Sequence, residues 1–126
     1  MPIDAADGSW TSKFVVVAPN AWDAAQATWL EQAMSVPTTY TFVIRHEPGD
    51  DFKAVGTQAS EAIIRRHPFT LLLVGHTHLF RYRASRKEVI VGNGGAPVSS
   101  GSYGFALLSQ REDGAIVIGQ YDWLSN

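Results

Sequence analysis

The chain has 126 residues, of which 45% are hydrophobic and none is cysteine, and its formal net charge is −2. This length fits a single domain over 1–126, and the lack of cysteine excludes disulfides, thiolate metal sites and cysteine catalysis. The near-neutral charge lacks the basic footprint of nucleic-acid binding, and no apolar run approaches the roughly 20 residues of a membrane span. We therefore expect a soluble domain with no nucleic-acid or membrane partner and no signal peptide in the chain as given.

Hydrophobic periodicity predicts strands that alternate with helices in the first part of the chain. A β-branched run at 13–19 predicts a strand buried on both faces, and the apolar spacing over 21–34 predicts a helix capped by Asn20. A second strand is expected at 40–46, followed by a turn-rich loop and a helix within 52–67. This succession is typical of a parallel sheet layered with helices.

The second part of the chain is expected to be rich in strands. The most apolar strand is predicted at 69–75, and further strands at 88–93, 103–110 and 115–123. The segment 92–104 has too many glycines for regular structure. The predicted fold is therefore α/β, with a β-α-β-α-β core and a β-rich C-terminal part that forms an edge or a second sheet.

Histidines stand at the ends of two predicted core strands. His46 ends the strand at 40–46, and His76 and His78 follow the strand at 69–75. Ligands of open parallel sheets bind beyond the carboxyl ends of the strands, so three imidazoles are expected at one rim. Residues i and i+2 of an extended segment point the same way, about 6.6 Å apart. Because neutral imidazole suits zinc, iron and manganese, the pattern predicts a divalent metal site.

Two nearby residues have a structural interpretation. Gly75 is expected to let the backbone approach the rim closely, because it has no side chain. His67 follows two arginines and precedes a proline, which favours a solvated helix end over a metal ligand.

Four segments resemble, in the same order, elements of calcineurin-like metallophosphoesterases. VGHTHLFR (74–81) resembles the Gly-His-x-His signature of this family, and VIRHEP (43–48) resembles its upstream His-x-Pro element. The helix AAQATWLEQAM (24–34) and the glycine-rich VGNGGAP (91–97) resemble two further elements. The ordered set is far more specific than any one of its members, and the helix together with HLFR leans toward the purple-acid-phosphatase-like branch.

This resemblance implies the C-terminal half of a four-layer α/β sandwich and a metal-dependent phosphoesterase. His46 and His76 would bind the second ion of a dinuclear centre and His78 the first, with manganese, iron or zinc as the metal. The substrate would be a phosphomonoester or a phosphodiester, hydrolysed by in-line attack of metal-bound hydroxide. Asn93, in the glycine-rich segment, is a candidate for contacting the substrate phosphate, although a plain turn explains it more simply.

The earlier elements of the family pattern have no counterpart in the chain. There is no Asp-x-His and no Asn-His-Asp/Glu element, and the pair Gly49-Asp50 follows His46, in the wrong order for the family's Gly-Asp element. Three neutral imidazoles without a bridging carboxylate would bind two cations weakly. The nearest carboxylates, on Glu47, Asp50 and Asp51, are candidates to supply one, although loop or helix-start charges explain them more simply.

Three hypotheses about function follow, and they leave open whether the chain acts as an enzyme by itself. In the first, it is half of a phosphoesterase, inactive alone, whose missing half lies in cis or in trans. In the second, it is a non-catalytic metal-binding or protein-interaction module. In the third, it is a mononuclear hydrolase with His46, His76 and His78 around one ion. We rank the first highest, because the motifs are kept in detail. An exposed sheet edge would favour a dimer or a partner complex.

Overall fold

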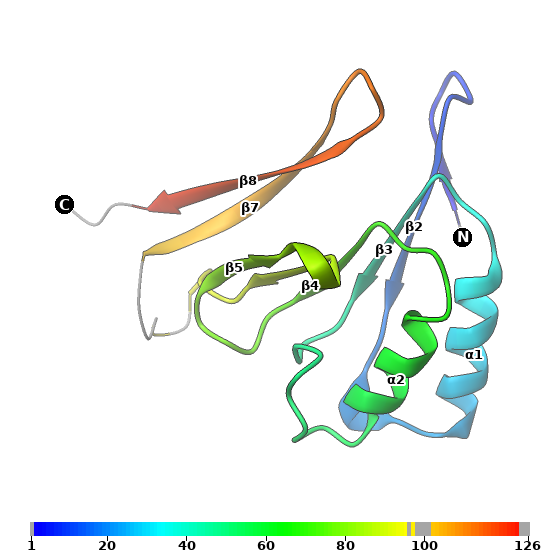
Figure 1. Cartoon of the computed structure of the whole chain (residues 1–126), viewed down its shortest axis with the longest axis vertical. Helices are drawn as coiled ribbons and strands as arrows, with labels where there is room; N and C mark the ends of the chain where they lie inside the picture. The colour runs from blue at the N-terminus through cyan, green and yellow to red at the C-terminus, as the bar shows by residue number, and fades with distance from the viewer. Residues whose placement is uncertain (1, 96, 98–101, 124–126) are drawn as a thin grey trace.

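The computed structural model describes residues 2–95, 97 and 102–123, and it has a mixed α/β fold (Figure 1). A six-stranded sheet has the order β1-β2-β3-β4-β6-β5. Its strands are β1 (Ile3–Asp4), β2 (Thr11–Val16), β3 (Tyr40–Ile44), β4 (Leu71–Val74), β5 (Phe80–Arg83) and β6 (Glu88–Val91). A two-stranded antiparallel sheet contains β7 (Tyr103–Gln110) and β8 (Ile116–Trp123). The helices are α1 (Ala24–Ser35) and α2 (Gly56–Ile64), with short 3-10 turns η1 (Pro19–Ala21) and η2 (Ala84–Arg86).

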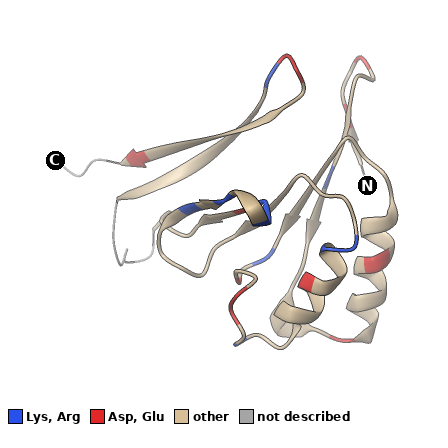
Figure 2. Cartoon of the chain, viewed as in Figure 1, with Lys and Arg blue, Asp and Glu red and all other residues tan. Residues whose placement is uncertain are grey.

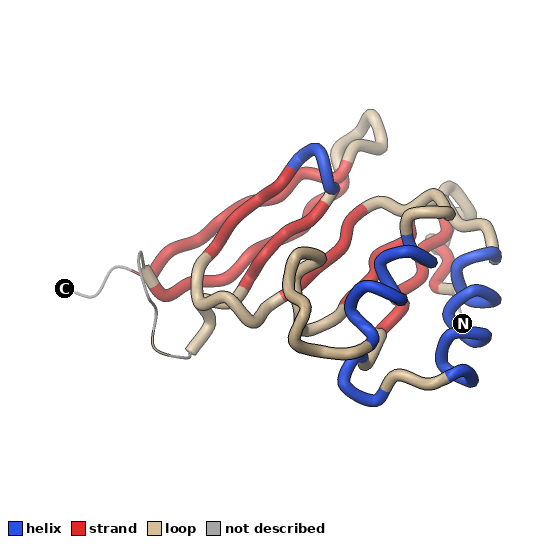
Figure 3. Tube along the Cα trace, turned by 60° about the horizontal axis from the view of Figure 1, so that its bottom comes forward, coloured by secondary structure: helices blue, strands red, loops and turns tan. Residues whose placement is uncertain are grey.

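The central strands β2, β3, β4 and β6 are parallel, while β1 and β5 pair antiparallel at the two edges. The expected β-α-β-α-β succession is confirmed. Helix α1 connects β2 to β3, and α2 connects β3 to β4, so successive crossovers move across the sheet in one direction. Right-handed crossovers then lie on one face, where Figure 3 shows the two helices side by side.

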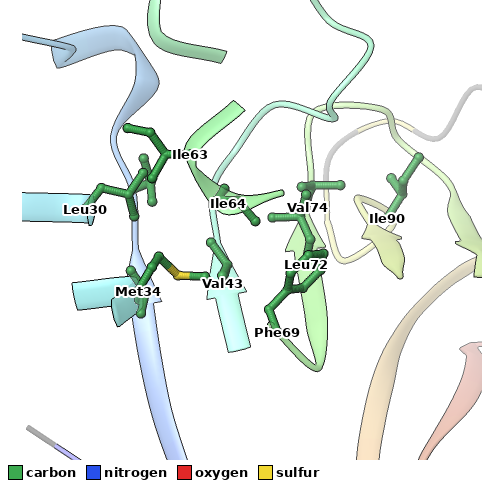
Figure 4. Packing of buried hydrophobic residues seen from close by; sticks show 11 residues of the cluster. Leu30, Met34, Val43, Ile63, Ile64, Phe69, Leu72, Val74 and Ile90 are labelled. Carbon is green, nitrogen blue, oxygen red and sulfur yellow. The ribbon is translucent and has the colours of Figure 1, made fainter. Parts of the chain in front are cut away.

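The main hydrophobic core lies between this helical layer and the sheet. Leu30 of α1, Ile64 of α2 and Leu72 of β4 are completely buried (Figure 4). Burial of one such side chain stabilises a fold by about 1.5–3 kcal/mol relative to its exposure. This layer therefore holds the strand ends that carry the histidines in a fixed frame.

The opposite face of the sheet is only partly covered. The β7-β8 hairpin packs Leu108 and Ile118 against a second cluster that includes Phe42 of β3. On β2, Phe14 and Val16 remain 52% and 64% exposed. The expectation of a strand at 13–19 buried on both faces is therefore wrong, because the second sheet does not extend over β2.

Two edge strands and one helix cap differ from the expectations. Strands β1 and β5 were not predicted, because each is short and is defined by its pairing with a neighbour. Asn20 does not cap α1; the Asp23 carboxylate accepts a hydrogen bond from the Gln26 backbone N–H at 2.7 Å. Among the described residues, no helix is both long enough and apolar enough to span a membrane.

Candidate metal centre

The carboxyl ends of the neighbouring strands β3 and β4 bring two of the predicted ligands together. The backbone N–H of Gly75 donates to the His46 carbonyl oxygen at 2.9 Å, which aligns the two strand exits. His76 Nδ1 lies 3.3 Å from His46 Nε2, and the two rings are nearly perpendicular, at 89°. The exposed His46 and the half-buried His76 thus form a pair that solvent ions can reach.

His76 occupies a strained backbone conformation. Its φ is +61°, in the left-handed region, and the Thr77 N–H donates to the Gly75 carbonyl at 2.7 Å. For a residue with a Cβ this region costs roughly 1–2 kcal/mol, and such strain is concentrated at functional sites. The expectation that Gly-His-Thr-His continues the strand is wrong, so the i, i+2 argument does not apply to His76 and His78.

His78 has a different hydrogen-bond partner and does not join this pair. Its Nδ1 is 2.7 Å from the Pro97 carbonyl oxygen, which only accepts hydrogen bonds, so Nδ1 carries the proton. In the neutral ring, Nε2 then keeps a lone pair that can bind a metal ion. Within residues 2–95, 97 and 102–123, no three histidine or acidic side chains converge closely enough to hold one ion.

The three candidate carboxylates have different surroundings. Asp51 Oδ2 lies 2.9 Å from His76 Nε2, so this residue joins the histidine pair. Asp50 pairs with Arg83 at 2.8 Å, and the hydrogen bond from this arginine lowers the pKa of Asp50. Glu47 is almost completely buried and accepts a hydrogen bond from the Asn20 side chain at 2.8 Å. Of the three candidates, Asp51 is therefore the one that contacts a predicted ligand, and no local sequence signal distinguishes it from Asp50.

Steric constraints at the rim require a glycine at position 92, directly after β6, and not at position 75. A Cβ on Gly92 would lie 2.0 Å from the Thr77 carbonyl oxygen, a backbone atom that cannot move aside easily. A Cβ on Gly75 would lie 3.6 Å from His46 Nδ1, in ordinary van der Waals contact. The close approach that the sequence assigned to Gly75 is thus made by Gly92, which packs against the turn between the two histidines.

The other sequence candidates have structural contacts. Asn93 is 2% exposed, and its side-chain amide donates to the Ser102 carbonyl at 2.9 Å, so it anchors the start of the hairpin. His67 Nε2 lies 2.8 Å from Glu31 Oε1, and its side chain is 16% exposed. The expected solvated environment of His67 is therefore wrong: it links the end of α2 to α1.

A buried ion pair supports the strand end next to His46. The Arg45 side chain is 0% exposed and its guanidinium lies 2.5 Å from Glu61 of α2. It also donates to the Glu47 carbonyl and to Ser60 Oγ. Sequence reasoning missed this network, because an arginine at a strand end is usually solvated.

An open hollow of about 780 Å³ lies beside the histidine pair. Its walls include Val16, Ile44, Leu73 and Val91, and His46 and Glu47 also line it. The hollow is continuous with the uncovered part of the sheet, because Val16 lines it and is exposed.

Comparison with known proteins adds no family to this description. No protein-family model matches the chain, and no curated protein matches it. The interpretation of the site therefore depends on its motifs, its donor atoms and their geometry.

Proposed function

We propose that the chain forms the C-terminal half of a calcineurin-like metallophosphoesterase domain and contributes metal ligands for the hydrolysis of phosphate esters. The observation that carries this proposal is the histidine pair. Two nitrogens bound to one tetrahedral ion at about 2.0–2.1 Å are about 3.3 Å apart. His46 Nε2 and His76 Nδ1 have this separation, 3.3 Å. In the metal-free chain this contact is a hydrogen bond, with a proton between the two nitrogens. A bound ion would take the place of that proton.

The layering of the chain supports the same proposal. Helices cover one face of the six-stranded sheet, while the other face is apolar and lies only partly under a second sheet. In a four-layer α/β sandwich, each sheet likewise has helices on its outer face and packs its inner face against the other sheet. The uncovered Phe14 and Val16 fit a position under further strands of the second sheet.

The donor set fits divalent manganese, iron or zinc. His46 and His76 would hold one ion, and His78, through Nε2, would contribute to another. Bound ions of this kind polarise phosphoryl oxygens and make hydroxide available near neutral pH. Imidazoles are neutral, so the positive charge of two ions requires carboxylates from outside these residues. For this reason we expect little hydrolysis by the chain alone.

Calorimetric titration of the metal-stripped, untagged chain with zinc and with manganese tests the proposal. We expect weak zinc binding that depends on the histidines, with slow or no hydrolysis of p-nitrophenyl phosphate and of its bis ester. Absence of binding at millimolar zinc would overturn the proposal. Tight binding of one ion per chain together with rapid hydrolysis would instead support the mononuclear hydrolase.

The outer face of the β7-β8 hairpin offers a surface for a partner, and the partner that fits it is the remainder of the phosphoesterase domain, in cis or in trans. The outer face of the hairpin bears exposed apolar side chains without charge between them: Tyr103, Phe105, Leu107, Val117, Tyr121 and Trp123. Figure 2 shows charge on the hairpin only at its turn and near the end of β8. Contiguous apolar faces of this kind mark interaction sites.

Light scattering at increasing protein concentration checks this surface. Without the remainder of the domain we expect the chain to self-associate through the hairpin. A charge on the outer face, Phe105→Lys, is expected to restore the monomer. The exposed Lys53→Ala is a surface control with no expected effect. A wild-type chain that stays monomeric at high concentration would count against an unfilled interface.

A further inference from the structure

We propose that Asp51 is a positioning residue for His76. Its carboxylate accepts the Nε2–H of the imidazole and so directs the unprotonated Nδ1 toward His46. The consequence for metal affinity rests on the proposed function, whereas the position of the proton is a property of the metal-free chain.

Two distances indicate where the ring proton of His76 lies. Asp51 Oδ2 lies 2.9 Å from His76 Nε2 in an ion-pair contact, and an ionised carboxylate presents only lone pairs, which favours the ring proton on Nε2. A neutral imidazole has one ring proton, which leaves a lone pair on Nδ1. That atom lies 3.3 Å from His46 Nε2. The ring therefore presents a ligand atom to the shared site, as metal-binding histidines do when a carboxylate holds the opposite nitrogen.

The loop holds Asp51 firmly enough for this role. Its backbone N–H donates to the Pro48 carbonyl at 3.0 Å, and its Oδ1 accepts from the Lys53 backbone N–H at 2.8 Å. The Asp51 side chain is 15% exposed and that of His76 is 35% exposed, so water reaches their contact mainly from the side of the ring. Oδ1 anchors the side chain to the loop, which leaves Oδ2 directed at the ring.

Because the backbone of His76 is in the left-handed conformation, the contact with Asp51 helps to orient its ring. The residue is strained at φ +61°, and its ring meets Asp51 at one nitrogen and His46 at the other. Without the carboxylate, only the weaker contact with His46 would orient the ring. We therefore expect the imidazole to lose its preferred orientation when Asp51 is removed.

Asp50 supplies a matched control. It is adjacent to Asp51 and has the same charge, but it pairs with Arg83 and not with His76. Asp50→Ala thus removes one carboxylate from the same loop and leaves the His76 contact in place. Asp51→Asn is the conservative variant, because its side-chain oxygen still accepts a hydrogen bond.

The experiment combines nitrogen NMR of the metal-free chain with zinc titration. At pH 8, where imidazole is ordinarily neutral, long-range ¹H–¹⁵N correlation should show His76 protonated on Nε2, with that proton protected from exchange. Asp51→Ala should lose the protection and bind zinc about 10- to 100-fold more weakly. Asp51→Asn should retain most of the affinity, and Asp50→Ala should behave as wild type.

Two results would overturn the role of Asp51. One is a His76 proton on Nδ1 in the wild-type chain. The other is a zinc affinity in Asp51→Ala equal to that of Asp50→Ala. If the wild-type chain binds no zinc, the proposed function fails, whereas a protected Nε2 proton that Asp51→Ala loses would still support the positioning role.

Discussion

Replacing His76 with alanine is expected to weaken zinc binding by at least about 100-fold, because loss of a direct ligand exceeds the 10- to 100-fold effect of its outer-shell partner. His46→Ala should have a similar effect, since the two nitrogens lie 3.3 Å apart and would share one ion. Calorimetry of the metal-stripped variants measures both affinities. The double variant His76→Ala/His78→Ala should also lose any second equivalent of bound ion.

The fourth histidine is the matched control for these variants. His67 pairs with Glu31 between the two helices, and this hydrogen bond and ion pair involve none of the histidines at the strand ends. His67→Ala should therefore bind zinc as tightly as wild type. Equal affinities for His67→Ala and His76→Ala would mean that the imidazoles at the strand ends do not form the site.

Replacing Glu61 with alanine is expected to lower the free energy of unfolding by about 3 kcal/mol, the lower end of the cost of breaking a buried ion pair. The change leaves the fully buried Arg45 guanidinium without its counter-charge. Neutral acceptors from Glu47 and Ser60 remain, which limits the loss. Urea unfolding followed by tryptophan fluorescence at pH 7 measures the change. Glu31→Ala, which removes an exposed carboxylate paired with Arg66 and His67, should have a smaller effect, because exposed pairs contribute little.

The contribution of Glu61 should also depend on pH. Burial raises the pKa of Glu61, but the charges and hydrogen bonds of Arg45 and Arg65 together outweigh it, so the net pKa lies below its ordinary value of 4.5. A carboxyl whose pKa is lower in the folded than in the unfolded chain stabilises the fold above the unfolded pKa. That stabilisation is lost as the pH falls through the folded pKa. The wild-type chain should therefore approach the stability of Glu61→Ala as the pH falls below about 4.5.

Urea midpoints of both proteins between pH 7 and pH 3 would show this convergence. A constant difference over the whole range would mean that the effect of Glu61 comes from packing and not from its charge. No difference at pH 7 would mean that Arg45 is accommodated without the ion pair.

Local sequence patterns determined much of the framework and two of the site residues. Continuous apolar runs identified β3 and β4, and the spacing of apolar and helix-forming residues identified α1 and α2, because these signals are contained in short segments of the chain. The carboxyl ends of parallel strands meet at one edge of a sheet. For this reason the positions of His46 and His76 in the sequence were enough to predict that they are neighbours.

Only the tertiary structure decided which other groups meet this pair. The approach of Asp51 to His76, the burial of Arg45 against Glu61 and the packing of Gly92 on Thr77 each join segments distant in the chain. No local propensity encodes such contacts, because they depend on how loops return to the sheet. The exposed face of β2 has the same origin: the run 13–19 has the apolar composition of a buried strand, but burial requires a covering layer, and the β7-β8 hairpin leaves Phe14 and Val16 exposed.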